Sequence, residues 1–199
     1  LSLKPPLPEL CPWHVPALQP ALPSTAMTLL DDEGQEITAL GQPGEIAIKG
    51  PQVMRGYWNR PEETALVMHG DWFKSGDIGV MDADGYTKIV DRKKEMILVS
   101  GFNVYPNEVE DVVASCPGVL EVGVIGMPDS KSTEKVVAYV VKKDQAITEE
   151  KVIEHCKEFL TNYKVPKEVF FTDELPKTNV GKILRRKIKE AHLEKLGLA

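Results

Sequence analysis

The residues of this chain best suited to chemistry lie near its C-terminus, in residues 176–182 (PKTNVGK), where Lys182 directly follows Gly181. A lysine is a compact positive charge on a flexible stem. On a short loop it can approach a phosphate or a carboxylate and then withdraw. Alone, the three residues VGK are more typical of a surface turn with a solvated lysine, because short motifs often occur by chance.

Two further segments change that interpretation. Residues 70–77 read GDWFKSGD, and the carboxylate of Asp77 could accept hydrogen bonds from both hydroxyls of a ribose, as acidic residues do in dinucleotide-binding folds. Residues 91–110 read DRKKEMILVSGFNVYPNEVE, a basic cluster followed by a short apolar strand and a glycine turn. Taken singly, these segments are equally consistent with a turn aspartate and an ordinary charged linker.

Together the three motifs resemble the C-terminal part of the adenylate-forming (AMP-binding) superfamily of acyl-CoA synthetases, luciferases and peptide-synthetase adenylation domains. The stretches DRKKEMILVSGFNVYPNEVEDVV and LPKTNVGKILRR are most similar to bacterial long-chain fatty-acid–CoA ligases. The resemblance implies an acid–thiol ligase that turns fatty acid, ATP and CoA into acyl-CoA, AMP and pyrophosphate through an acyl-adenylate. It extends from about Leu29 to the end of the chain.

The resemblance also implies roles for single residues. Lys182 is the catalytic residue, which neutralises charge between the carboxylate and the α-phosphate during adenylation. Asp77 and Arg92 contact the ribose of ATP, and Ser75 keeps a hydroxyl where the family usually has threonine. Lys94 is the hinge about which the C-terminal domain swivels between the two half-reactions, with the neighbouring lysine at position 93 as an alternative pivot.

For the thioester step, the resemblance places the loop around Gly101 along the tunnel for the pantetheine arm of CoA. Glycine lets a ligand pass close to the backbone. Phe102 and Asn103 belong to the same CoA-binding set, with Tyr105 as a weaker candidate. Basic residues at the start of the last helix could attract CoA phosphates, although a solvated basic face is the preferred interpretation: Arg185, Arg186 and Lys187.

Several parts of the implied enzyme are missing from this sequence. The glycine- and hydroxyl-rich phosphate loop is absent, as is the aromatic–Gly–x–Thr–Glu motif that holds adenine and Mg²⁺ in the family. We therefore expect a fragment that is inactive alone, needs the missing N-terminal domain, and has its Mg²⁺ site there. Two alternatives stay open: a fragment of a medium-chain or aryl acid–CoA ligase, and a non-catalytic module that binds CoA or a partner protein.

Composition excludes other classes of protein. The 199 residues are 42% hydrophobic and 27% charged, as in an ordinary globular protein, and the net charge of −6 argues against nucleic-acid binding. The cysteines, Cys11, Cys116 and Cys156, lack metal-ligand spacing, so we predict no metal site and a reduced, cytoplasmic protein. Residues 1–23 have no continuous apolar core of the kind that a secretory signal requires. A peripheral position at the inner membrane is left open.

The pattern of the chain predicts an α+β fold. The resemblance implies that this fold is the lid domain of an adenylate-forming enzyme, preceded by part of a small β-barrel. We divide the chain into an irregular, proline-rich segment (1–26), a barrel remnant (27–91) and the lid domain (92–199). We expect the lid domain to fold by itself, since its amphipathic helices and β-branched strands can close one core. Its predicted order is βαββαβα, with strands at 96–100, 119–127, 136–142 and 169–172 and helices from 106, from 148 and at 183–196.

Overall fold

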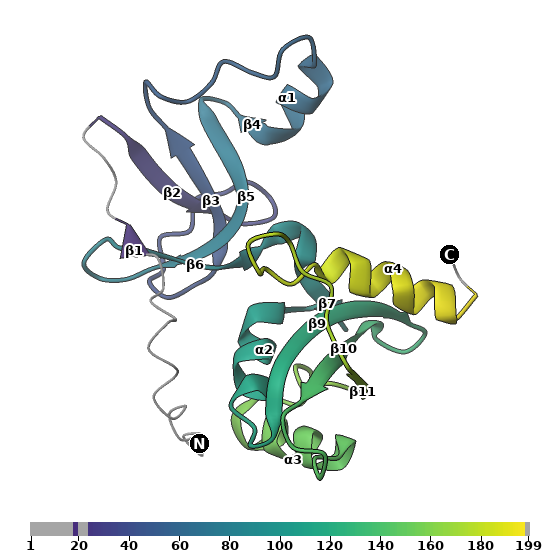
Figure 1. Cartoon of the computed structure of the whole chain (residues 1–199). Coiled ribbons are helices and arrows are strands. Elements are labelled where there is room, and N and C mark those ends of the chain that lie inside the picture. Colours follow the sequence, from purple (N-terminus) through teal and green to yellow (C-terminus); the bar gives the residue numbers. More distant parts are fainter. Residues whose placement is uncertain (1–17, 20–23, 198–199) are drawn as a thin grey trace. The chain divides into compact units, whose positions relative to one another are not determined.

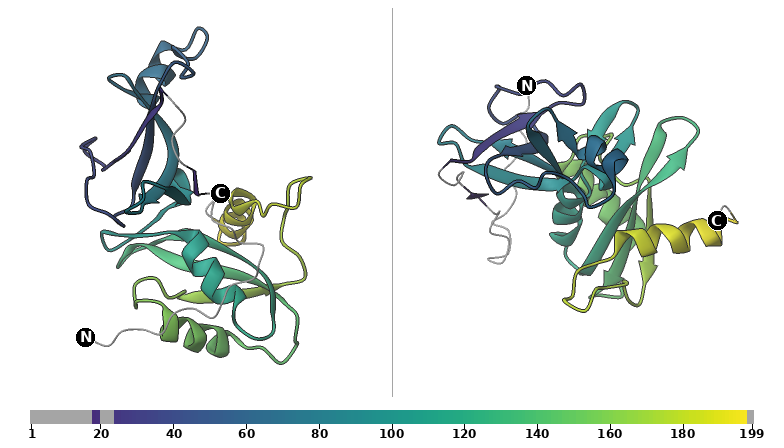
Figure 2. Two further views of the ribbon diagram at one scale, coloured as in Figure 1. Left: turned by 90° about the vertical axis from the view of Figure 1, so that its left-hand side faces the viewer. Right: turned by 90° about the horizontal axis from the view of Figure 1, so that it is seen from above.

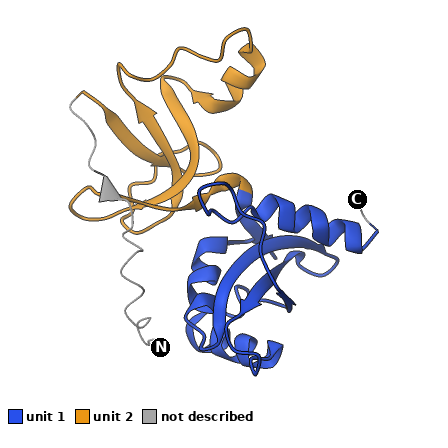
Figure 3. Cartoon of the chain, viewed as in Figure 1, with its two compact units in different colours: residues 1–12, 95–199 blue, residues 13–94 orange. Residues whose placement is uncertain are grey.

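The computed structural model describes residues 18–19 and 24–197. Contacts within the chain divide it into two compact units, one ending at Lys94 and the other beginning at Glu95 (Figure 3). The prediction for residues 1–26 lies almost wholly outside the described residues.

The unit that ends at Lys94 is built on an antiparallel sheet (Figure 1). Its strand order is β1-β6-β5-β3-β2, and the short β4 pairs with β5. Helix α1 begins with a proline in its first turn, where the missing N–H of proline costs no hydrogen bond. The elements are β1 (Leu18–Gln19), β2 (Ala26–Leu30), β3 (Gly44–Lys49), α1 (Pro61–Val67), β4 (Met68–His69), β5 (Trp72–Met81) and β6 (Thr87–Arg92).

Strand β5 differs from the sequence-based expectation. Apolar alternation in the sequence indicates a strand only over Ile78–Met81, but β5 already begins at Trp72. Its first half pairs with β3, and the register then shifts across residues 75–77, where Gly76 has φ = +75°. Such a bulge breaks the period-2 alternation that marks a strand in the sequence, and it turns side chains in new directions. The GDWFKSGD motif is therefore a bulged strand.

The second unit is a mixed sheet with helices on both faces. Strands β9 and β10 form a long antiparallel hairpin, and β11 pairs parallel to β10. The α+β class predicted from the sequence is confirmed. The elements are η1 (Lys93–Glu95), a 3₁₀ turn that starts in the first unit, and then β7 (Ile97–Val99), β8 (Phe102–Val104), α2 (Pro106–Ala114), β9 (Val119–Asp129), β10 (Thr133–Lys142), α3 (Glu149–Phe159), β11 (Glu168–Thr172) and α4 (Arg185–Lys195).

Helices α2 and α3 pack on one face of this sheet, and α4 packs on the other (Figure 2). Alternate residues of β10 supply the two clusters, because successive side chains of a strand point to opposite faces. The cluster under α2 and α3 takes Val136, Ala138 and Val140, whereas the cluster under α4 takes Val137, Tyr139 and Val141.

The helices α2 and α3 lie where the apolar periodicity predicts them. Thr148 caps α3 by accepting a hydrogen bond from the backbone N–H of Lys151 at 3.4 Å. Cys116 and Cys156 are buried and free, as expected of core residues. Burial raises the pKa of the Cys156 thiol to about 12, and nearby Cys116 adds to the effect.

One strand and one helix boundary in this unit were predicted wrongly. The order predicted from the sequence lacks strand β8, because three residues directly after a two-residue turn give almost no periodic signal. The last helix begins at Arg185, not at Ile183, which forms an isolated bridge with Lys177.

A buried histidine on α4 predicts a pH dependence of stability. His192 is 4% exposed, and its Nδ1 lies 2.7 Å from the hydroxyl of Tyr139. Burial lowers the pKa of His192; Lys135 and Lys195 act in the same direction, and Glu168 opposes them. The unfolded chain binds a proton below about pH 6.5, but the folded unit resists it. We expect the unfolding free energy to be constant above about pH 7 and to fall below about pH 6.5, by at most about 1.4 kcal/mol per pH unit for this proton.

Urea unfolding between pH 5 and 8 measures this dependence. The His192→Gln variant should have a flatter profile, whereas His69→Gln, a change at an exposed histidine of the other unit, should keep the wild-type slope. Equal slopes for wild type and His192→Gln would contradict the expectation.

Candidate functional site

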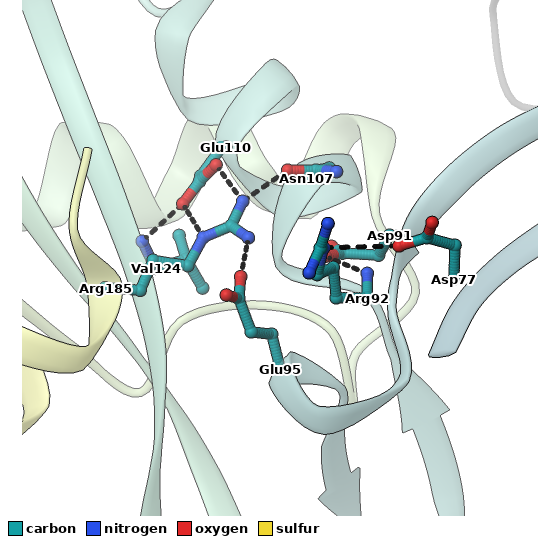
Figure 4. Close-up of polar contacts among 8 residues, drawn as sticks. All are labelled: Asp77, Asp91, Arg92, Glu95, Asn107, Glu110, Val124 and Arg185. Carbon is teal, nitrogen blue, oxygen red and sulfur yellow. Dashed lines mark hydrogen bonds and ion pairs between the residues drawn. The ribbon is translucent and has the colours of Figure 1, made fainter. Parts of the chain in front are cut away.

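Asp77 and Arg92, the predicted ribose ligands, face each other across neighbouring strands. They are register partners in β5 and β6, and Arg92 Nε lies 3.2 Å from Asp77 Oδ1 (Figure 4). The Asp77 side chain is 26% exposed and that of Arg92 is 58% exposed. The backbone N–H of Asp77 donates to Ser75 Oγ at 3.1 Å, which orders the bulge below the carboxylate. The structure thus brings both candidates to one solvent-accessible place as an ion pair.

An open pocket of about 410 Å³ adjoins this ion pair. Its lining carries three cationic side chains and one carboxylate, but two of the cations are already in ion pairs, Arg92 with Asp77 and Lys93 with Glu45. All lining residues belong to the unit that ends at Lys94: Glu45, Ser75, Gly76, Arg92, Lys93 and Lys94.

Glu45 is a site residue that the sequence analysis missed. Its side chain is 8% exposed, and Oε2 lies 3.1 Å from Lys93 Nζ, which also lies 3.0 Å from Asp32 Oδ1. Burial opposes the charge of Lys93, but hydrogen bonds to Asp32 and Glu45 outweigh it and raise the pKa of Lys93. The only signal in the sequence is one carboxylate directly before the apolar run Ile46–Ile48 of the strand GEIAIK.

The Gly101 loop is a two-residue hairpin turn between β7 and β8. Both of its residues have positive φ, +50° at Ser100 and +84° at Gly101, as a type I′ turn requires. A Cβ at Gly101 would meet no atom within 4 Å, so the turn is open to solvent.

The aromatic residues beside this turn differ in their exposure. Phe102 is 55% exposed and stacks on Tyr163 with ring centroids 4.7 Å apart, and Asn103 is also exposed. Tyr105 is 8% exposed, so its ring is not presented to a ligand as those of the exposed residues are.

Lys182 lies in a compact loop before α4. Thr178 closes this loop: its N–H donates to the Lys182 carbonyl at 2.8 Å, and its Oγ1 accepts from the Lys182 N–H at 3.0 Å. Gly181 has φ = +82°, and its N–H donates to the Thr178 carbonyl at 2.9 Å. The Lys182 side chain is exposed, and it forms no ion pair with any of the described residues. A fixed backbone therefore carries a free cation.

The interpretation of residues 185–187 as a solvated basic face is wrong for Arg185. Its side chain is only 15% exposed, and it binds Glu110 with two hydrogen bonds, Nε to Oε1 at 2.8 Å and Nη2 to Oε2 at 2.5 Å (Figure 4). It also binds Glu95 and Asn107. Arg186 does fit the prediction, since its side chain is 86% exposed and forms an ion pair with Glu190 on the same helix.

The described residues contain neither a metal-binding cluster nor a membrane-spanning helix. No group of three or more His, Cys, Asp and Glu side chains in the described ranges could hold a metal ion. Of the helices in residues 24–197, none combines the length and apolarity needed to cross a bilayer.

Comparison with known proteins identifies the family. Residues 108–182 match the family of AMP-binding enzyme C-terminal domains, and residues 7–58 match the AMP-binding enzyme family. The chain therefore belongs to the adenylate-forming, AMP-binding superfamily, and the recognition made from the three motifs is confirmed.

Within this superfamily, the chain is similar to curated long-chain-fatty-acid–CoA ligases. It is 54% identical to one from Escherichia coli O6:H1 over 178 residues, and 45% identical to one from Bacillus subtilis over 185 residues. These matches cover 89% and 92% of this chain but only 32% and 31% of those proteins. The chain thus spans about a third of the length of these relatives.

Solved structures give the same family. ATP-bound MatB from Rhodopseudomonas palustris matches with a TM-score of 0.80 and 38% identity, over 87% of this chain and 35% of that one. A fatty acyl CoA synthetase from Mycobacterium tuberculosis matches with a TM-score of 0.64 and 39% identity, over 88% of this chain and 35% of that one. The predicted fold, that of an adenylate-forming enzyme, is confirmed.

Proposed function

We propose that this chain is the C-terminal part of a long-chain fatty-acid–CoA ligase, which joins fatty acid and CoA at the expense of ATP through an acyl-adenylate. The observation that carries the proposal is the 54% identity to a ligase of that name across 89% of the chain. An o-succinylbenzoate-CoA synthetase of Bacillus subtilis is 36% identical, which makes the alternative of an aryl acid ligase the weaker one.

In the adenylation step, the carboxylate of the fatty acid attacks the α-phosphate of ATP, and pyrophosphate leaves. Asp77 and Arg92 would hold the ribose, with the carboxylate of Asp77 accepting from its hydroxyls. Lys182 would approach the developing negative charge at the α-phosphate, where a fixed cation stabilises the transition state more than the ground state. The free side chain of Lys182 and its closed loop support this role.

In the thioester step, the thiol of CoA attacks the acyl carbon and displaces AMP. The open turn at Gly101 would line the path of the pantetheine arm, with Phe102 and Asn103 beside it. Lys94 would be the hinge for a rotation of the C-terminal domain between the two steps. The rotation would remove the Lys182 loop from the reacting centre and bring the Gly101 turn there.

The proposal also covers parts of the protein outside this chain. Residues 27–91 would belong to the barrel that closes the N-terminal domain, and residues 92–199 would form the lid domain. The magnesium ion that accompanies ATP would be held by the N-terminal domain, whose presence we propose is required for activity. The pocket for the acyl chain would lie there as well, and so would any surface for peripheral membrane attachment.

The proposal can be tested by an assay of the complete protein, encoded by the gene that contains this sequence. With ATP, Mg²⁺ and CoA, we expect it to convert palmitate to palmitoyl-CoA faster than octanoate or benzoate, with release of pyrophosphate. The 199-residue chain alone should release none. A preference for benzoate would replace the proposal with the aryl acid alternative. Failure to form any CoA ester would favour the non-catalytic module.

A further inference from the structure

The residue before Lys94 is fixed within the first unit. Lys93 Nζ lies 3.0 Å from Asp32 Oδ1 and 3.1 Å from Glu45 Oε2, and both carboxylates belong to the same unit as Lys93. Glu45 is 7% exposed and sits in β3, inside the sheet. A buried carboxylate is strongly destabilised without its partner, so this contact resists separation. Lys93 therefore ends the first unit as an anchored residue.

The residue after Lys94 is fixed within the second unit. Glu95 Oε2 accepts a hydrogen bond from Arg185 Nη1 at 2.5 Å. Arg185 in turn is held by the two hydrogen bonds to Glu110 on α2, whose Oε1 also accepts the backbone N–H of Val124 in β9 at 2.8 Å (Figure 4). Paired Arg–carboxylate hydrogen bonds of this kind fix geometry as well as adding energy. Glu95 is thus connected to α2, β9 and α4.

Lys94 lies between these two anchored residues and differs from both. Its side chain is exposed, and it forms no ion pair or hydrogen bond with another side chain in the described part of the chain. A hinge residue must change its backbone angles with little loss of contacts. Lys94 is the middle residue of the 3₁₀ turn η1, so a rotation there opens that turn alone, whereas a rotation at Lys93 or Glu95 would also pull a charged side chain from its partners.

We infer that the swivel is confined to Lys94 by two charge anchors, one in each unit: Lys93 with Glu45 and Asp32, and Glu95 with Arg185. The inference rests on the hinge role given under the proposed function and deepens it, because it assigns Lys93 and Arg185 as positioning residues and removes Lys93 as an alternative pivot. Arg185 also lies three residues after Lys182, at the first position of α4. The exit of the hinge and the catalytic loop are therefore fixed to one body.

Backbone relaxation of the ¹⁵N-labelled 199-residue chain tests the inference without any assay of activity. In the wild type, we expect relaxation dispersion, which reports motion on the μs–ms scale of domain hinges, at the Lys94 amide and none at Lys93 and Glu95. Arg185→Gln should introduce such exchange at Glu95 and Met96 but not at Lys93. Lys93→Gln should introduce it at Lys93 itself but not at Glu95.

Arg186→Gln is the matched control, since it removes a neighbouring, exposed guanidinium whose ion pair, with Glu190, lies within α4. It should leave residues 93–96 unchanged. If the amide chemical shifts of β9 and β10 show that Arg185→Gln is unfolded, Glu95→Ala breaks the same contact while Arg185 stays bound to Glu110. Equal flexibility at positions 93, 94 and 95 in the wild type would overturn the inference, as would a rigid Glu95 in both folded variants. Neither result depends on whether the complete protein is a ligase.

Discussion

Replacement of Lys182 by alanine is expected to lower the rate of adenylate formation by about 10²- to 10³-fold, the usual cost of removing one preorganised charge or donor from a transition state. The change should leave the fold intact, because the Lys182 loop is closed by Thr178 and by backbone atoms that alanine retains. The expectation can be tested in a hybrid protein, in which this chain replaces the matching 178-residue segment of the E. coli relative. Pyrophosphate release with ATP, Mg²⁺ and palmitate measures the first step.

The second step should behave differently in the same variant. Supplied palmitoyl-adenylate should still react with CoA at close to the wild-type rate, because the role proposed for Lys182 is confined to formation of the adenylate. Lys187→Ala is the matched control: this lysine is also exposed, on the first turn of α4, and its loss should alter neither step. Equal losses in both steps for Lys182→Ala would refute the division of roles between the two loops.

Replacement of Gly101 by leucine should have the opposite effect, with thioester formation slowed by about 10²-fold and adenylation retained. A side chain on the open turn would stand in the proposed path of the pantetheine arm, and a displacement of about 1 Å at a reacting group can cost this much. The unit should still fold, because a Cβ at this position meets nothing within 4 Å. The strain of a leucine at φ = +84° costs about 1–2 kcal/mol.

Gly85→Leu separates that strain from the blocked path. Gly85 has φ = +82°, its Cβ would also meet nothing within 4 Å, and it lies in the turn between β5 and β6 of the other unit. It should lower the unfolding free energy of its unit by a similar amount while CoA transfer proceeds normally. Two variants with the same defect in CoA transfer would indicate that strain, and not the path of the thiol, explains the effect. Transfer from supplied palmitoyl-adenylate to CoA is the measurement for both.

Much of the fold could be predicted from the sequence because its signals are local. The helix from Pro106 is predicted by its apolar spacing and by a proline at its first position. The next helix is predicted by its apolar spacing and by the capping hydroxyl of Thr148. The β9–β10 hairpin follows from two runs of β-branched residues. Strand β8 and the first half of β5 escaped prediction because each exists through pairing with a neighbour, β7 for the former and β3 for the latter.

The candidate site residues likewise fall into those with a local signal in the sequence and those without one. Asp77, Arg92 and Lys182 stand in short motifs, so the resemblance could single them out. The side-chain contacts that position these residues within each unit could not be predicted from motifs. Lys93 and Glu45 are 48 positions apart, and Arg185 is 75 positions from Glu110 and 90 from Glu95. Nothing in a sequence marks which of its many charged residues will meet over such separations, and only the folded chain reveals the partners.

The alternation along β10 limits how the length of this strand can vary. Its even-numbered residues from Val136 to Val140 serve the cluster under α2 and α3, and its odd-numbered residues from Val137 to Val141 serve the cluster under α4. Insertion or deletion of one residue would exchange the two sets, because the side-chain period of a strand is two. The hydrogen bond between Tyr139 and His192 would then be lost, and α4, which follows the Lys182 loop, would lose the apolar surface on which it packs. Only paired insertions or deletions keep both layers in phase.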